Sequence, residues 1–208
     1  MRVSRNAAAA STLIVASILL AGCSSRPERV YPPAIDPGEA GAGAMEKYDT
    51  DGDGRVAGEE LQNAPTLRIA MERLDQNNDN AVTADEVADR VRAWQESRVG
   101  RMSGQCLVTY RGEPLSGAKV VFDPEEFLGD EIKPATGTTD EYGMAMISIE
   151  TDPDDPNDVP GIAPGLYLVR ITSDQIDLPP RYNTETVLAC EMAQDNMAMQ
   201  SGIEFNLQ

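Results

Sequence analysis

Hydrophobic residues are spaced in three different ways along the chain. Near the N-terminus they form one short apolar run, residues 13–21. In the middle they recur at the spacing of one helix face, which predicts a helix over residues 83–98. From Gly104 onward they alternate with polar residues, as in half-buried strands. The helical positions are Val87, Val91 and Trp94.

The C-terminal half, residues 102–208, has the pattern of short strands joined by turns. Alternation in QCLVTY and AKVVF surrounds an expected turn at Arg111–Gly112. A second turn is expected at residues 140–143, between ATGTT and MAMISI. Many short strands with almost no helical period favour an antiparallel β-sandwich of Ig-like or transthyretin-like type.

Five segments of this half occur in the order found in a known family. They are VTYRGEPLSGAKVVF, ATGTTDEYG, PGLYLVRI, LPPRY and IEFNL. In this order they resemble the carboxypeptidase regulatory-like domain. The resemblance implies a transthyretin-like sandwich that serves as a structural or interaction module and has no catalytic residues.

The N-terminus has the features of an export signal. Arg2 and Arg5 precede the apolar run, which is too short for a confident membrane span. The run ends in the sequence LAGC at residues 20–23, which resembles the lipobox of bacterial lipoproteins. The resemblance implies that residues 1–22 are a signal peptide and that Cys23 is acylated after cleavage. The alternative is an ordinary signal peptide with an incidental cysteine.

The lipobox resemblance implies an exported protein held on a membrane of the bacterial cell envelope by a lipid anchor. Ser24 follows the cysteine, and by resemblance to enteric lipoproteins this favours the outer membrane, facing the periplasm or the surface. Residues 23–44 contain many prolines and glycines, so we expect them to form a flexible linker.

Composition narrows the possible partners. The chain has 35 acidic and 17 basic residues and a net charge of −18, which argues against nucleic acid and favours cationic partners or metal ions. It has no histidine, which excludes histidine-based catalytic triads and ordinary zinc sites.

An acidic loop of residues 49–60, DTDGDGRVAGEE, has the spacing of a calcium-binding loop. Calcium takes six to eight oxygen ligands, and this spacing supplies them from one short segment. Gly54 stands where such a loop turns with positive φ. The expected ligands are Asp49, Asp51, Asp53, the carbonyl of Arg55 and a bidentate Glu60. We call this segment loop one.

Residues 75–86, DQNNDNAVTADE, repeat the pattern, and we call them loop two. Asn80 replaces the glycine, and asparagine tolerates left-handed backbone better than most residues. Loop two has fewer acidic ligands and is expected to bind more weakly; the alternative is a partner that only supports loop one. The expected ligands are Asp75, Asn77, Asp79, the carbonyl of Ala81, Thr83 and Glu86.

The two loops together resemble an EF-hand pair, over residues 45–99. The resemblance implies one or two bound Ca²⁺ ions and a short antiparallel bridge between Val56 and Val82. The predicted fold class is therefore α+β, with a small all-α EF-hand pair followed by the sandwich. Only residues 61–74 separate the loops, so the pair is compact, with Pro65 in the first turn of a helix.

Two cysteines remain beyond Cys23. Cys106 and Cys190 both lie in predicted strands. In an exported protein they can form a disulfide, and the alternative is two separate buried thiols.

The function expected from the sequence is that of a calcium-binding, lipid-anchored envelope protein whose sandwich contacts an envelope protein or polysaccharide. The alternative is a carbohydrate- or peptide-binding surface receptor in which calcium is only structural. No pair of nucleophile and base can be named, so we do not expect an enzyme.

Overall fold

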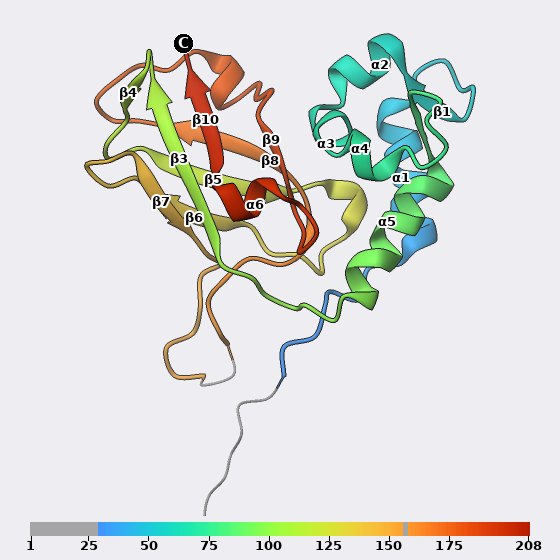
Figure 1. Ribbon diagram of the computed structural model, residues 1–208, viewed down its shortest axis with the longest axis horizontal. Coiled ribbons are helices and arrows are strands. Elements are labelled where there is room, and N and C mark those ends of the chain that lie inside the picture. The colour runs from blue at the N-terminus through green and yellow to red at the C-terminus, as the bar shows by residue number, and fades with distance from the viewer. Residues whose placement is uncertain (1–28, 156–157) are drawn as a thin grey trace, which may run out of the picture.

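The computed structural model describes residues 29–155 and 158–208, which form two packed units (Figure 1). Residues 29–100 form a helical unit, and residues 101–208 form a β unit with two sheets. The protein thus has the expected mixed α+β composition. Among the described residues, no helix has the length and apolar character needed to cross a bilayer. Residues 1–22 and Cys23 lie outside the described residues.

The helices of the helical unit precede and follow the two acidic loops along the chain. The helix expected over residues 83–98 is present as α5, and Pro65 is the first residue of α3, where its missing N–H costs nothing. The elements are α1 (Pro37–Tyr48), β1 (Arg55–Ala57), α2 (Gly58–Asn63), α3 (Pro65–Ile69), α4 (Met71–Leu74), β2 (Ala81–Thr83) and α5 (Ala84–Glu96).

The first helix begins well before the boundary expected from the sequence. Residues 37–44 were expected to be flexible linker, but they belong to α1. Asp36 caps the helix, since its Oδ1 accepts hydrogen bonds from the backbone N–H groups of Gly38 (2.8 Å) and Glu39 (2.9 Å). Pro37 at the first helical position is already restricted to a helical φ. A local cap therefore starts a helix in a segment whose composition suggests a linker.

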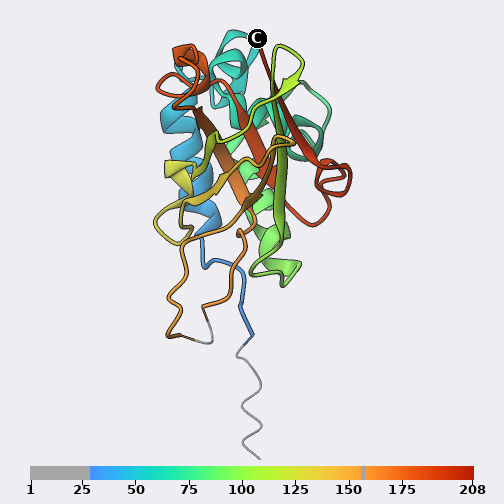
Figure 2. The same ribbon diagram turned by 90° about the vertical axis from the view of Figure 1, so that its left-hand side faces the viewer.

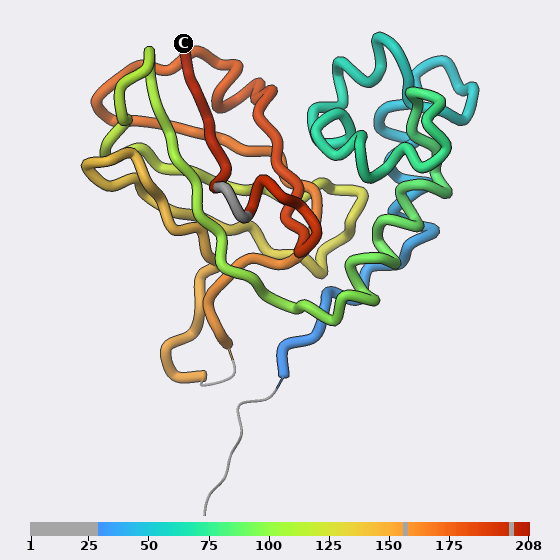
Figure 3. The backbone as a smooth tube through the Cα atoms, in the orientation of Figure 1, coloured from blue at the N-terminus to red at the C-terminus, as the bar shows by residue number. Residues whose placement is uncertain are grey.

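Glycines in α1 allow this helix to pack closely against other segments of the folded protein. A Cβ atom at Gly41 would lie 2.3 Å from the carbonyl oxygen of Ala84, at the start of α5. Residues before α1 are also docked: Gln95 of α5 donates from Nε2 to the carbonyl oxygens of Ile35 (2.8 Å) and Pro33 (3.3 Å). In Figure 3 this segment runs past the end of α5 before it enters α1. The docked part of the chain thus begins before Met45.

The strands of the β unit form two four-stranded sheets. One has β3 in the centre, paired with β10 on one edge and with β4 and β7 on the other. The second has the order β6-β5-β8-β9 and is antiparallel throughout. The strands are β3 (Gly104–Tyr110), β4 (Glu113–Pro114), β5 (Lys119–Pro124), β6 (Ala135–Thr138), β7 (Met144–Ile147), β8 (Gly165–Thr172), β9 (Ala189–Met192) and β10 (Ile203–Leu207).

One strand departs from the expected antiparallel arrangement. Strand β10 runs parallel to β3, with Phe205 opposite Val108. The chain leaves β9 at the edge of one sheet and reaches β10 in the other through the short helix α6 (Ala198–Ser201). A connection between sheets is not a hairpin, so it does not force the next strand to reverse direction.

The two sheets bury a common core. Phe122 of β5 lies edge-on to Tyr167 of β8 and to Phe205 of β10, with ring centroids 6.1 Å apart in both pairs. The second contact joins the two sheets. The loop between β7 and β8 extends from the same end of the molecule as the described N-terminal segment (Figures 1 and 2).

Candidate metal centre

Loop one is folded around the carboxylate of Asp49, which follows the last residue of α1. Its Oδ1 accepts hydrogen bonds from the backbone N–H groups of Gly52 (2.8 Å) and Asp53 (3.1 Å), and its Oδ2 accepts one from Gly54 (2.8 Å). Gly54 has φ +86°, the left-handed conformation that glycine adopts without steric cost. The sequence position predicted to turn sharply therefore does so.

Three carboxylates of loop one come together. Asp49, Asp51 and Asp53 each offer one oxygen, and these three oxygens lie within 4.8 Å of one another. Two unit charges at that distance repel by about 1 kcal/mol in water and by about 3 kcal/mol near a protein surface. A cation among them would turn this repulsion into attraction, so these three residues could hold a metal ion.

Glu60, the last expected ligand of loop one, reaches back across the loop. Its Oε1 accepts hydrogen bonds from the backbone N–H (2.7 Å) and hydroxyl (2.9 Å) of Thr50, and its Oε2 accepts one from the N–H of Ala57 (3.2 Å). These hydrogen bonds lower the pKa of the Glu60 carboxyl below its usual range, and the bond from Ala57 has the largest effect. Glu60 is thus held across the loop by hydrogen bonds, and the close group of carboxylate oxygens consists of Asp49, Asp51 and Asp53 without it.

Loop two repeats most of the hydrogen bonds of loop one at equivalent positions. Asp75 accepts from the N–H of Asp79 (3.1 Å) through Oδ1 and from that of Asn80 (2.9 Å) through Oδ2. Asn77 also accepts from Asp79 (2.9 Å), and Asp79 accepts from Ala81 (3.0 Å). Asn80 has φ +62°, matching the conformation of the glycine in loop one. The replacement therefore leaves the loop geometry intact.

Glu86, the last expected ligand of loop two, has one unsatisfied oxygen. Its Oε2 accepts from the N–H and hydroxyl of Thr83, both at 2.9 Å, which caps α5. Its Oε1 is buried and has no hydrogen-bond partner among the described residues. The residue is only 7% exposed, and a buried carboxylate oxygen is normally paired with a donor or a cation. Glu86 could therefore offer this oxygen to a metal ion.

A two-stranded sheet joins the loops. β1 and β2 pair antiparallel, with Val56 opposite Val82 as expected, and both valine side chains are fully buried. Arg55 and Ala81, whose carbonyls were expected as ligands, are the first residues of these strands. Arg55 also forms an ion pair across the loops, from Nη2 to Oδ2 of Asp79 (2.6 Å). The two loops therefore form one structural unit.

The remaining cysteines lie in strands of the β unit. Cys106 in β3 and Cys190 in β9 are both free and buried. The Sγ of Cys190 lies 3.8 Å from the Sδ of Met192. Burial raises the pKa of the Cys106 thiol to about 12 and also raises that of Cys190.

Two important glutamates were not identified from the sequence. The side chains of Glu125 and Glu191 in the β unit are fully buried and accept hydrogen bonds from the helical unit. Glu191 stands in the stretch LACEMA, a charged residue in a strand that is otherwise apolar. A charged residue in an apolar stretch could have been recognised from the sequence as a candidate for burial. The segment PEEF, residues 124–127, does not indicate which of its two glutamates is buried.

No protein-family model matches this chain, no curated protein matches it, and no solved structure matches it.

Proposed function

We propose that this protein binds one or two Ca²⁺ ions through loops one and two, which act as an EF-hand pair. The β unit is proposed to be a transthyretin-like sandwich of the carboxypeptidase regulatory-like type, serving as a structural or interaction module. The chain is proposed to be exported and anchored to the outer membrane through a lipid on Cys23. An envelope protein or polysaccharide is the proposed partner class, and no catalytic role is proposed.

The observation that carries the calcium proposal is the unpartnered Oε1 of Glu86 at the last ligand position of loop two. The matched hydrogen bonds of the two loops and the gathered carboxylates of Asp49, Asp51 and Asp53 support it. Oxygen ligands of this kind and number suit Ca²⁺, which accepts flexible geometry. Mg²⁺ demands a nearly ideal octahedron and loses its water reluctantly, so we expect it to bind more weakly.

Calorimetric titration tests the proposal directly. Residues 24–208 in solution, which retain every described residue, are titrated with calcium and separately with magnesium. We expect saturable calcium binding, lost in large part in Glu60→Gln and at the second site in Glu86→Gln. Glu59→Gln is the matched control, because Glu59 is exposed, adjacent and outside the expected ligand set. Absence of a saturable response up to about 10 mM, above the range of extracellular sites, would reject the proposal.

The lipid anchor has its own test. Cells expressing the full chain are labelled with a radioactive fatty acid, and the protein is recovered from the membrane fraction. Label is expected on the unaltered chain and not on the Cys23→Ala variant. Equal labelling of both would show that Cys23 is not the acylated residue.

A further inference from the structure

Two buried carboxylates of the β unit hold the helical unit next to its two loops. Glu125 lies between β5 and the 3₁₀ turn η1 (Glu126–Leu128), and Glu191 lies in β9. Both side chains have no exposed surface, so each charge depends entirely on its protein partners.

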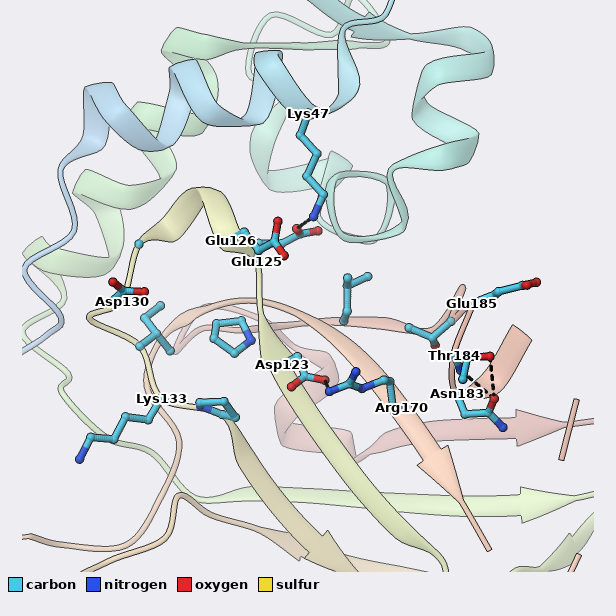
Figure 4. A pocket seen from close by; sticks show the side chains of 16 residues that line it. Lys47, Asp123, Glu125, Glu126, Asp130, Lys133, Arg170, Asn183, Thr184 and Glu185 are labelled. Carbon is cyan, nitrogen blue, oxygen red and sulfur yellow. Dashed lines mark hydrogen bonds and ion pairs between the residues drawn. The ribbon is translucent and has the colours of Figure 1, made fainter. Parts of the chain in front are cut away.

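Glu125 holds the end of α1. Its Oε2 accepts a hydrogen bond from Nζ of Lys47 (2.8 Å), and its Oε1 accepts from the hydroxyls of Tyr48 (2.8 Å) and Thr66 (2.5 Å). Figure 4 shows Lys47 reaching down from α1 to this carboxylate, at the margin of a cleft of about 710 Å³. Lys47 and Tyr48 are the last residues of α1, immediately before Asp49. The first ligand of loop one is thus fixed to the β unit through its neighbours.

Glu191 has the same relation to loop two. It accepts hydrogen bonds from Nε of Arg73, from Nε of Arg90 (2.5 Å) and from Nε1 of Trp94 (3.1 Å). Arg73 belongs to α4 and stands two positions before Asp75, the first ligand. Arg90 and Trp94 belong to α5, which begins within loop two. One carboxylate therefore joins the helices on both sides of this loop.

These contacts can act on calcium affinity because the loop ends cannot move independently of them. Three donors surround each carboxylate, and displacing any of them would leave a buried charge underpaired, which is costly. A loop whose ends are already fixed loses less freedom when it closes around an ion, and a preorganised site binds more tightly.

We propose that Glu125 and Glu191 are positioning residues for the calcium loops, Glu125 for loop one and Glu191 for loop two. The inference rests on the proposed calcium binding. It adds that the β unit is the internal partner of the helical unit and raises its calcium affinity. Because coupling between two equilibria is reciprocal, calcium must also tighten the contact between the two units.

The test measures each loop separately. In residues 24–208, Glu86→Gln leaves loop one as the binding site, and Glu60→Gln leaves loop two. Adding Glu125→Gln should weaken calcium binding about tenfold in the first background and much less in the second. Adding Glu191→Gln should give the opposite pattern. Glu126→Gln is the matched control for Glu125, because its side chain is adjacent but exposed.

A second measurement needs no substitution at the contact. Hydrogen exchange of the unaltered chain is followed with and without calcium. Calcium should slow exchange of the Glu125 amide, which donates to the carbonyl oxygen of Leu166 (3.0 Å), and of the amides of β9. This measurement remains decisive if either glutamine variant fails to fold, and unchanged exchange in both segments overturns the inference.

The outcomes separate the two proposals. If the unaltered chain does not bind calcium, the proposed function fails and the inference fails with it. If it binds and the glutamine variants bind equally well, the function stands and the positioning role is refuted. Equal weakening of both loops by each variant would indicate general destabilisation, which also overturns the assignment of one glutamate to each loop.

Discussion

Replacing Glu191 with glutamine should destabilise the protein even without calcium. The carboxylate is fully buried and accepts from Arg73, Arg90 and Trp94, and the first two of these donors are cationic. Glutamine has nearly the same shape but carries no charge and has only one accepting oxygen. Its NH₂ group would face a guanidinium, so two donors would oppose each other.

The expected loss follows from these contacts. A hydrogen bond to a charged group contributes about 1.5–3 kcal/mol, and breaking a buried ion pair from one side costs about 3–5 kcal/mol. Arg90 keeps its two bonds to Asp195, at 2.7 and 2.8 Å, so it does not become fully unpaired. Arg73 is 20% exposed at its side chain and can be partly hydrated. We therefore expect the free energy of unfolding to fall by about 3 kcal/mol, the lower end of that range.

The assay is urea unfolding of residues 24–208 in a calcium chelator, followed by circular dichroism, because the substitution itself changes the surroundings of Trp94. The midpoint should fall while the slope stays constant. In a thermal scan the melting temperature should fall by about 6–12 °C, from about 2–4 °C per kcal/mol for a chain of this length. Glu185→Gln is the control: Glu185 is exposed, and we expect a change within about 0.5 kcal/mol.

A loss below about 1 kcal/mol for Glu191→Gln would refute the reasoning, since it would mean that the buried ion pairs have little net effect. A double-mutant cycle measures the interaction energy between Arg73 and Glu191. Arg73→Gln combined with Glu191→Gln should show a coupling energy of at least about 1 kcal/mol, whereas additive losses would mean that the two side chains do not depend on each other.

Three other outcomes are expected from the same structure. Asn80→Ala should destabilise the chain by about 1 kcal/mol in urea unfolding, because alanine tolerates the left-handed backbone poorly, whereas Asn80→Gly should not. Cys106 and Cys190 should both be unreactive towards a thiol reagent at pH 8, because burial raises the pKa of each thiol, and fewer than two thiols after denaturation would indicate a disulfide. Hydrogen bonds from Arg90 lower the pKa of Asp195, so this carboxylate stabilises the fold above its ordinary pKa and less as the pH falls below about 4. The difference in unfolding free energy between the unaltered chain and Asp195→Asn should therefore shrink as the pH is lowered, and a constant difference would contradict the assignment.

The loops could be predicted from the sequence because their geometry is local. The expected aspartate ligands of the two loops and Asn77 accept hydrogen bonds from backbone groups two to five residues ahead, as Asp49 does from Gly52, Asp53 and Gly54. Such contacts depend on spacing alone, so a pattern of residue types is enough to identify them. The start of α3 at Pro65 was predictable for the same reason.

The start of α1 could not be predicted in this way. Its glycines and alanines have the composition of a linker, and their use is apparent only in the folded protein. Gly41 lies against the backbone of Ala84, and a Cβ atom at Gly43 would come within 2.9 Å of Phe127. Small residues serve here for close packing between segments that are distant in sequence. The parallel direction of β10 could not be predicted from the sequence either, because it depends on which sheet the chain enters after β9.

The carboxylates of this chain occupy two different environments, the acidic loops and the buried contact between the units, and the proposed calcium sites depend on both. In loop one, Asp49, Asp51 and Asp53 bring three carboxylate oxygens within 4.8 Å of one another. At the contact between units, Glu125 and Glu191 are buried and each is paired with lysine or arginine. Repulsion in an empty loop tends to spread its ends apart, and the ends are what these two glutamates hold. The buried pairs therefore oppose opening of the empty loops and preserve a geometry close to that needed for binding. On this reasoning calcium removal should loosen the contact between the units before it unfolds either one, and hydrogen exchange should report the change at Glu125 and β9 first.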